Sequence, residues 1–207
     1  MAAGLSQIAT NMIATLGYGG LAFGLVVDSA GVPIPSEVLL PLAGAVAKQG
    51  EMSLLMVIIV GTLAQTLGAI LAYTIGTGPG LVLIKKYGKY VLFSEHELEK
   101  THALFAKYGA WLTLVGRCLP GVRTYIGFPA GIARMNFALF ATASFIGSLI
   151  WTIFLSVLGY QLADHLHVID SVLSKFGYVF AVAGIVFFVW FVHRHTKKRK
   201  ASKEARK

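Results

Sequence analysis

The chain alternates between long apolar stretches without charge and short segments in which the charged residues gather. Lys, Arg, Asp and Glu are absent from residues 1–27, 52–84, 135–163 and 176–193. A transmembrane helix needs about 20 apolar residues, so this pattern predicts membrane spans at 52–76, 137–160 and 174–192. The composition, 56% hydrophobic and 13% charged, agrees with an all-α integral membrane protein, because about a quarter of the residues in soluble domains are charged.

Two further stretches, residues 18–48 and 108–133, are apolar but interrupted by prolines. Proline inside a helix removes a backbone donor and clashes with the preceding turn. Backbone groups freed in this way at membrane depth must face protein or water. Residues 38–47 are also too few to cross a bilayer. We therefore predict a re-entrant hairpin in each stretch, with two kinked full crossings per stretch as the alternative.

The two interrupted stretches carry similar markers in the same order. Each starts with Tyr-Gly, breaks at proline, resumes through a further proline and an Ala-Gly pair, and reaches a charged residue and a methionine before a long span. The markers are Tyr18, Pro33, Pro35, Pro41, Gly44 and Glu51 in one copy, and Tyr108, Pro120, Pro129, Gly131 and Arg134 in the other. An odd number of crossings separates the copies, which predicts an inverted repeat. Inverted repeats of broken helices are typical of secondary transporters, whose site lies at the breaks.

The distribution of charge predicts the orientation. Residues 194–207 contain eight Lys or Arg and one acid, and such a block after a span marks the cytoplasmic side. The segment 81–107, with interfacial helices, then also lies in the cytoplasm, while the uncharged residues 1–17 are expected to form an interfacial helix. Residues 1–193 thus form a single predicted membrane domain. The tail suits anionic lipid headgroups, and no nucleic-acid partner is expected.

One face of the span at 52–76 carries small residues four apart. They are Ala64, Gly68, Ala72 and Gly76, and Gly80 continues the series. Small residues at this spacing allow close approach between helices, so a hairpin is expected to pack there. Gln65, in the middle of the span, is interpreted as an interhelical hydrogen-bond donor rather than a ligand group.

Two arginines, Arg117 and Arg123, lie inside the second interrupted stretch. Arginine at mid-bilayer costs about 2.5 to 3.5 kcal/mol on insertion scales, so the pair indicates a functional site. A helix break at Pro120 and Gly121 would act as a hinge and allow both side chains to converge on one anion. Guanidinium groups bind phosphate bidentately, and the helix that restarts after the break adds backbone donors. We therefore predict that Arg117 and Arg123 bind phosphate.

Two acids, Asp28 and Glu37, flank the prolines Pro33 and Pro35 of the first stretch, which form its predicted hinge. Burial disfavours an ionised carboxylate and a nearby arginine favours it, and such competition suits a proton carrier. Asp28 and Glu37 are accordingly predicted to couple transport to protons or to pair with the arginines. A purely structural pairing that holds the hairpins together is the alternative.

Several motifs together resemble the DedA family of bacterial membrane proteins, over roughly residues 15–165. They are Val-Pro-Ile-Pro-Ser-Glu at 32–37 with its continuation to Gly44, Gly68-x4-Tyr73-x2-Gly76, Arg117-x2-Pro120-x2-Arg123, Pro129-Ala130-Gly131 with Met135, and Gly147-x3-Trp151. The resemblance implies a lipid transporter related to eukaryotic VTT-domain scramblases. Several members are associated with returning undecaprenyl phosphate across the bacterial cytoplasmic membrane, with dependence on proton or sodium gradients.

The resemblance also assigns roles to individual residues. Glu37, Arg117 and Arg123 match the essential acid and arginines of the family. Asp28 stands where glutamate is common, which keeps the charge but shortens its reach.

Together these observations predict a flippase for a phosphate-bearing lipid, foremost undecaprenyl phosphate. Its other partners are protons or sodium ions and membrane lipids; no cofactor, metal site or catalytic residue is predicted, and a homo-oligomer is compatible with the sequence. The main alternative is an integral-membrane polyprenyl-pyrophosphate phosphatase. Hydrolysis requires a nucleophile or a metal-bound water, and the candidate nearby, Ser36, equally suits a helix cap. A non-transporting membrane assembly factor is a third possibility.

Overall fold

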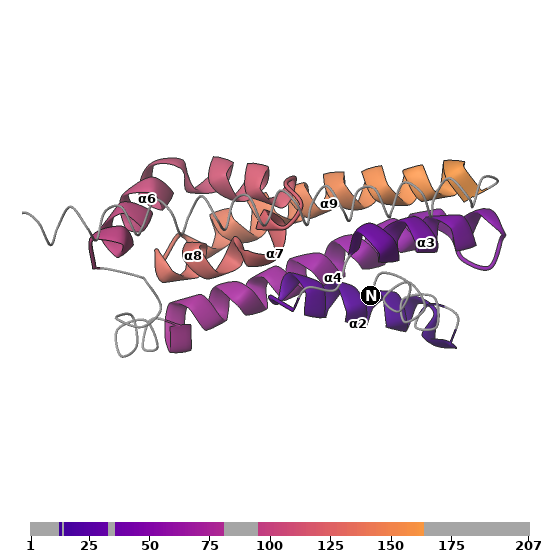
Figure 1. The fold of residues 1–207 in the computed structure, drawn as a ribbon, viewed down its shortest axis with the longest axis horizontal. Helices are drawn as coiled ribbons and strands as arrows, with labels where there is room; N and C mark the ends of the chain where they lie inside the picture. Colours follow the sequence, from indigo (N-terminus) through magenta and orange to yellow (C-terminus); the bar gives the residue numbers. More distant parts are fainter. Residues whose placement is uncertain (1–12, 14, 33–35, 81–94, 164–207) are drawn as a thin grey trace, which may run out of the picture. The chain divides into compact units, whose positions relative to one another are not determined.

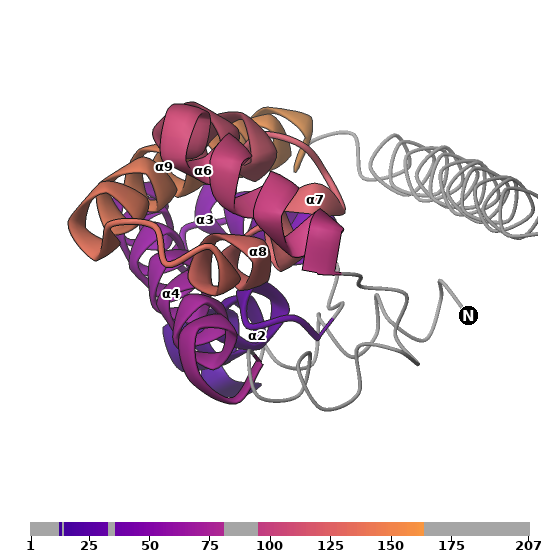
Figure 2. The same cartoon turned by 90° about the vertical axis from the view of Figure 1, so that its left-hand side faces the viewer.

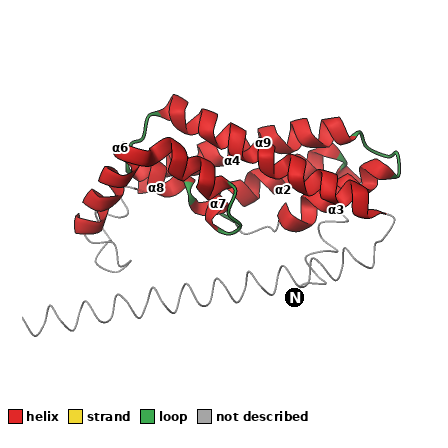
Figure 3. Ribbon diagram, turned by 90° about the horizontal axis from the view of Figure 1, so that it is seen from above, coloured by secondary structure: helices red, strands yellow, loops and turns green. Residues whose placement is uncertain are grey.

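The computed structural model describes residues 13, 15–32, 36–80 and 95–163 (Figure 1). These residues form helices and contain no strand (Figure 3), which confirms the predicted all-α fold for this part of the chain. The helices are α2 (Tyr18–Ser29), α3 (Ser36–Lys48), α4 (Leu54–Ile75), the π-helical turn η1 (Gly76–Gly80), α6 (Glu95–Arg117), α7 (Val122–Tyr125), α8 (Gly127–Ile132) and α9 (Phe137–Leu162).

Within the described residues, two helices are long and apolar enough to cross a membrane. They are the 25-residue stretch Leu54–Gly78, which comprises α4 and the start of η1, and the 26-residue helix α9, and they coincide with two of the three predicted spans. Both expose large apolar side chains, such as Leu67 and Phe154, as a lipid-facing helix does. The two helices run in opposite directions (Figure 1).

The breaks in the two interrupted stretches lie where prolines and glycine predict them. In the first, α2 ends at Ser29 and α3 begins at Ser36. In the second, Pro120 and Gly121 form the turn between α6 and α7, and Gly121 has a φ of 75°. Residues other than glycine rarely adopt this left-handed conformation, so the turn requires glycine here.

Helix α6 continues without interruption across residues 107 and 108, where the sequence suggests a change from an interfacial helix to a hairpin. Gly109 does not end the helix but serves its packing. A Cβ atom at this position would lie 2.9 Å from the sulfur of Met135. Glycine inside a helix is therefore a contact residue here rather than a stop signal.

The helices α2 and α3 of the first interrupted stretch are called the first hairpin, and the end of α6 with α7 and α8 the second hairpin. Helix α3 crosses α9 at a pair of glycines. A Cβ at Gly44 would overlap the carbonyl oxygen of Ser156 and lie 3.0 Å from the backbone nitrogen of Tyr160. A Cβ at Gly159 would overlap the carbonyl oxygen of Pro41. Backbone touches backbone at this crossing, which only glycine allows.

The second limb of the second hairpin, α8, crosses the end of α4 in the same way. A Cβ at Gly131 would overlap the carbonyl oxygen of Tyr73 and lie 3.0 Å from the backbone nitrogen of Thr77. A Cβ at Gly76 would lie 2.5 Å from the carbonyl oxygen of Phe128. At each crossing, the Cβ position of one glycine lies against two backbone atoms of the partner helix. These are the carbonyl oxygen three residues before the partner glycine and the nitrogen one residue after it. The two crossings therefore have equivalent geometry.

Substitution of Gly159 by alanine is expected to destabilise the protein by about 1–3 kcal/mol, as overpacked cores do. The added methyl group meets backbone atoms of α3, with the carbonyl carbon of Pro41 at 2.6 Å, and backbone cannot turn aside as a side chain can. The free energy of unfolding in detergent micelles measures the effect.

A matched control is Gly19→Ala. Gly19 lies in α2 with no atom within 4 Å of its Cβ position, so alanine is expected to be neutral or slightly stabilising there. Equal stability of the two variants would contradict the close crossing.

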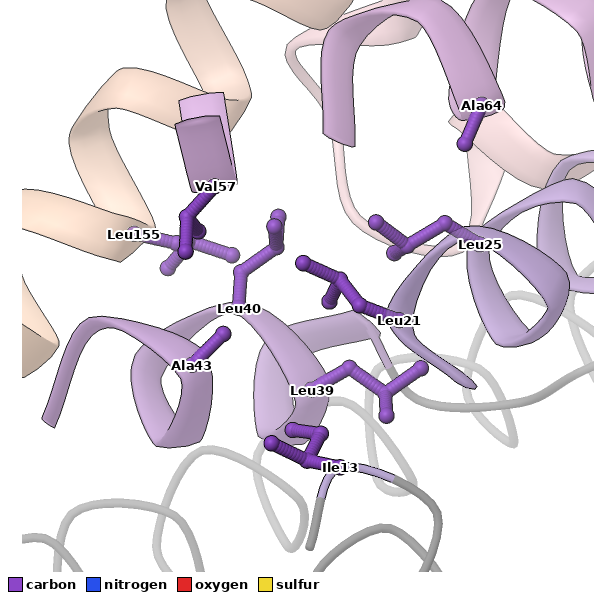
Figure 4. Packing of buried hydrophobic residues seen from close by; sticks show 9 residues of the cluster. All are labelled: Ile13, Leu21, Leu25, Leu39, Leu40, Ala43, Val57, Ala64 and Leu155. Atoms are coloured by element: carbon purple, nitrogen blue, oxygen red, sulfur yellow. The ribbon is translucent and has the colours of Figure 1, made fainter. Parts of the chain in front are cut away.

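The first hairpin is anchored by a cluster of buried apolar side chains (Figure 4). Leu21 and Leu25 of α2 meet Leu39 and Leu40 of α3 in this cluster. The other members come from α3, α4, α9 and the segment before α2, and are Ala43, Val57, Ala64, Leu155 and Ile13. The cluster therefore holds both limbs of the hairpin against the two long helices.

Tyr73 of α4 contacts the segment between α8 and α9 and the first turn of α9. The Tyr73 hydroxyl donates a hydrogen bond of 2.5 Å to the carbonyl oxygen of Met135, and its ring stacks on Phe140 with centroids 4.7 Å apart. Seen from the end, α8 lies between α6 and α4 (Figure 2). The short helix α8 thus packs between two long helices.

The small face of α4 makes the close contacts predicted for it. A Cβ at Gly68 would lie 2.6 Å from Cβ of Ser29, and one at Gly127 would lie 2.8 Å from Cβ of Ala72. Together with Gly76, this face receives the end of α2 and the start of α8. The break of each hairpin is therefore held close to α4.

Several expected features lie outside the described residues. They are most of the interfacial helix 1–17, the prolines Pro33 and Pro35, residues 81–94, the third span 174–192 and the tail 194–207. They stay predictions.

Candidate functional site

Arg117 and Arg123 are among the largest fully buried side chains of the described residues, with 1% and 2% of their surface exposed. Arg117 is the last residue of α6, and Arg123 is the second residue of α7. The turn at Pro120 and Gly121 separates them, so the two side chains are not bound to one helix face. Both guanidinium groups therefore enter the interior from the same break.

Arg123 binds four side chains from three other segments. Its Nη2 donates to a carboxylate oxygen of Asp28 and to the hydroxyl of Ser36. Its Nη1 donates to Oε1 of Gln65 at 2.9 Å, and its Nε lies 3.7 Å from Oε1 of Glu37. Two carboxylates thus balance the charge of Arg123, and the ion pairs join α7 to both limbs of the first hairpin.

The two acids differ in their surroundings. The Asp28 side chain is 4% exposed, and its second oxygen faces the hydroxyl of Thr124 at 3.4 Å. The Glu37 side chain is 24% exposed, and its Oε2 lies 3.4 Å from the hydroxyl of Ser36. Asp28 is therefore an enclosed partner of Arg123, whereas Glu37 is a looser partner that solvent or a ligand reaches more easily.

Gln65 connects the arginine to α9. While its Oε1 accepts from Arg123, its Nε2 donates to the hydroxyl of Thr152 at 3.1 Å. This confirms the interpretation of Gln65 as an interhelical hydrogen-bond donor. On α9 itself, the ring of Trp151 lies 5.2 Å from the guanidinium carbon of Arg123, a distance typical of a cation–π contact.

Arg117 has a different environment. Its Nη1 reaches the hydroxyl of Ser29 at 3.5 Å, a long hydrogen bond, while Nε and Nη2 have no partner. Among the described residues no carboxylate lies within 4 Å of it. Arg117 is consequently a buried cation with free donors, beside a second arginine whose charge is already balanced.

The sequence pattern anticipates only part of this arrangement. The structure brings Arg123, Asp28 and Glu37 together, and places Arg117 by Ser29, next to Asp28 in the chain. The role of Ser36 as a partner of Arg123 was missed, because a serine before an acid at a helix start reads as a cap. Trp151 entered only as a family marker.

An apolar groove of about 400 Å³ lies next to the break, on the outer face of α6 and α7. Its lining includes Tyr108, Trp111, Val115, Leu119, Val122 and Ile126. Leu119 and Val122 belong to the segment between the two arginines, so the break presents apolar side chains to the groove and guanidinium groups to the interior.

Known proteins resemble this chain along most of its length. A membrane protein of Bacillus subtilis, YkoX, is 32% identical over 92% of this chain and 84% of its own. Undecaprenyl phosphate transporter A of the same organism is 33% identical over 95% of this chain and 96% of its own. A protein of Lactococcus lactis named alkaline phosphatase-like protein is 29% identical over 94% of each chain. No solved structure matches the chain.

The VTT domain matches residues 34–161, which include α3, α4 and all helices from α6 to α8 together with nearly all of α9. The family match and the relatives confirm the resemblance to the DedA family and place the chain among membrane proteins. This chain therefore belongs to the VTT domain family.

Proposed function

We propose that this protein is a transporter that moves a phosphate-bearing lipid, undecaprenyl phosphate, across the bacterial cytoplasmic membrane. The observation that carries the proposal is the fully buried guanidinium of Arg117, whose Nε and Nη2 have no hydrogen-bond partner, beside Arg123, which is paired with acids. An arginine inside the membrane is costly, and its presence therefore indicates a functional site; a guanidinium group binds phosphate bidentately. The relative named undecaprenyl phosphate transporter A supports the choice of lipid.

The charge balance of the site supports coupling to protons or sodium ions. The two arginines and the two acids have opposite formal charges that cancel, so an added phosphate leaves the buried site negative. A proton on a carboxylate, or a sodium ion beside it, restores neutrality. Glu37 is the acid proposed to take this role, because its side chain is the more exposed of the two.

The apolar groove supports a lipid as the ligand. In this proposal the hydrocarbon chain leaves the site along the groove beside Leu119 and Val122, while the phosphate turns inward to Arg117. An amphipathic ligand matches a break with one apolar and one cationic side. A small soluble anion would use only the cationic side.

The two equivalent glycine crossings support an inverted repeat of re-entrant hairpins. In such folds the hairpins rock against the opposite half around a central site. The proposed protein is a multi-pass transporter with its basic C-terminal tail in the cytoplasm, in accord with the distribution of positive charge.

Transport in proteoliposomes tests the proposal. The purified protein is expected to move labelled undecaprenyl phosphate between leaflets, and an imposed proton or sodium gradient is expected to change the rate. Absence of transport under both gradients by folded, inserted protein would reject the function.

Glu37→Gln is expected to transport the lipid at a rate that no longer responds to the ion gradient. Glutamine keeps the shape and one acceptor of Glu37 but has no charge to exchange. Glu51→Gln is the matched control, since Glu51 is an exposed acid between α3 and α4. A Glu37→Gln protein with the response of the wild type would exclude Glu37 as the coupling residue.

A phosphatase is the second candidate, because Ser36 lies between Arg123 and Glu37 and one relative is named alkaline phosphatase-like. The hydroxyl of Ser36 already accepts from Arg123, which makes it a structural partner rather than a free nucleophile. Incubation with undecaprenyl pyrophosphate is therefore expected to release no phosphate. Release that Ser36→Ala abolishes would favour the enzyme.

A further inference from the structure

Six buried side-chain nitrogen or oxygen atoms in the described part of the chain have no hydrogen-bond partner. Five of them belong to Arg117 and to three residues of α9: Nε and Nη2 of Arg117, Oγ of Ser144, Oγ of Ser148 and Nε1 of Trp151. The sixth is Oγ of Ser156, farther along α9. Buried polar groups in proteins are nearly always paired, so five unpaired atoms in one region point to a ligand.

The three α9 residues surround the place where Arg117 touches that helix. A Cβ at Gly147 would lie 2.6 Å from Cβ and 3.3 Å from Cγ of Arg117, so glycine there makes room for the arginine stem. Ser144, Gly147, Ser148 and Trp151 follow the i, i+3, i+4, i+7 spacing of one helix face. This face therefore lies beside Arg117, and through Trp151 it also contacts Arg123.

The chemistry of the unpaired atoms defines the ligand. Arginine and tryptophan nitrogens only donate hydrogen bonds, and a serine hydroxyl readily donates one. Because Arg117 has no carboxylate partner among the described residues, the ligand must supply both acceptors and negative charge. A terminal phosphate offers three non-bridging oxygens and binds guanidinium in the bidentate manner.

We infer that Ser144, Ser148 and Trp151 of α9 form, with Arg117, the receptor for the terminal phosphate of a phosphomonoester. The inference rests on the proposed function and deepens it, since it names the headgroup class and assigns different roles to the two arginines. Arg117 binds the phosphate, whereas Arg123 holds the acids of the first hairpin. Trp151 contacts Arg123 through its ring, and its free Nε1 belongs to the α9 face that packs on Arg117 at Gly147.

The enclosure of the receptor selects a monoester over a diester. Ser144 and Ser148 are 0% exposed and Arg117 is 1% exposed. A phosphodiester lipid carries an alcohol on the far side of its phosphate and needs space for two substituents. A monoester needs an opening for its hydrocarbon chain alone.

The test compares the wild type with Ser144→Ala/Ser148→Ala and with Trp151→Phe, as full-length protein in phosphatidylcholine nanodiscs and proteoliposomes. Ser156→Ala is the matched control, because this hydroxyl is equally buried, equally unpaired and on the same helix but lies at the Gly44 crossing. The ligands are undecaprenyl phosphate, phosphatidate, phosphatidylglycerol and inorganic phosphate. Binding is read from ligand-induced thermal stabilisation, and transport from its half-saturating concentration and maximal rate.

The double alanine variant is expected to need at least about tenfold more phosphomonoester lipid for half-saturation, since hydrogen bonds to charged groups are among the stronger ones. Trp151→Phe keeps the ring beside Arg123 and loses only the donor, so a smaller rise of several-fold is expected. The unfolding temperature without ligand is expected to stay the same in both, because no formed hydrogen bond is lost. Ser156→Ala is expected to behave as the wild type.

Each outcome of this test either supports or overturns the inferred receptor. Wild-type affinity in the double variant would overturn the inference; this result is expected if the hydroxyls bond to carbonyls of their own helix. An equal loss of affinity in Ser156→Ala would also overturn it. Tighter binding of phosphatidylglycerol than of the phosphomonoester lipids would overturn it as well. If the protein binds phosphatidate or inorganic phosphate and the α9 substitutions weaken this binding, the inference is supported. If undecaprenyl phosphate is not bound in the same experiment, only the proposed lipid is rejected. No binding of any phosphomonoester would reject both.

Discussion

An Arg117→Gln variant is expected to lose transport of the lipid phosphate by at least about 30-fold while it folds at least as stably as the wild type. Removal of one partner from a buried, hydrogen-bonded charge pair costs about 2 to 5 kcal/mol of binding. In the protein without ligand, however, Arg117 has no carboxylate partner among the described residues and two unpaired nitrogens. Glutamine removes a buried cation that forms no ion pair, and with it the cost of desolvating that cation, which favours folding rather than opposing it.

The combination of lost function and kept stability is the informative result. Transport is measured in proteoliposomes, and stability by thermal unfolding in detergent. Lys107→Gln is the control, since it removes an exposed positive charge from the same helix. Wild-type transport by Arg117→Gln would favour a non-transporting assembly factor, and a large loss of stability would show that Arg117 is a structural residue.

An Arg123→Gln variant is expected to lose about 3–5 kcal/mol of stability, the effect of breaking a buried ion pair. The substitution leaves Asp28, whose side chain is 4% exposed, without its counter-ion. It also removes the groups that join α7 to Ser36 and to Gln65. Chemical unfolding in detergent micelles measures the change.

The double variant Asp28→Asn/Arg123→Gln tests whether the lost stability comes from an unpaired buried charge or from the changed shape of the side chains. Removal of both members of a buried pair is often nearly neutral, so the double variant is expected to recover much of the stability that Arg123→Gln loses. A double-mutant cycle gives the coupling energy directly. Additive losses would mean that the ion pair does not act as a unit.

Substitution of the two arginines is thus expected to have opposite effects: Arg117→Gln loses transport and keeps stability, whereas Arg123→Gln loses stability. The sequence pattern does not distinguish the two residues. Their position in an apolar stretch with a proline between them predicts a candidate site at the break, where the structure buries both side chains. Which arginine meets the acids depends on the packing of four helices, and no local pattern contains that information. The two long helices were easier to predict, because the length of an uncharged run limits where a span begins and ends.

The proposed phosphate receptor on α9 has a sequence pattern of its own, which the positions of charged residues and prolines do not reveal. Ser144, Ser148, Thr152 and Ser156 recur every four residues, and all four are completely buried. Hydroxyl residues in apolar helices commonly bond to their own backbone, as Thr62 and Thr66 of α4 do. Only the packing of Arg117 on Gly147 distinguishes the two serines near the break from the others.

The paired glycine crossings also show that the two halves of the described chain depend on each other for their packing. Gly44 rests on the helix of Gly159, and Gly131 on the helix of Gly76, so each half of the chain completes the packing of the other. A polypeptide with one half alone would find the same contact only on a second copy of itself turned end over end. This reciprocal packing is what the proposed inverted repeat requires, with the acids Asp28 and Glu37 in one half and the arginines Arg117 and Arg123 in the other.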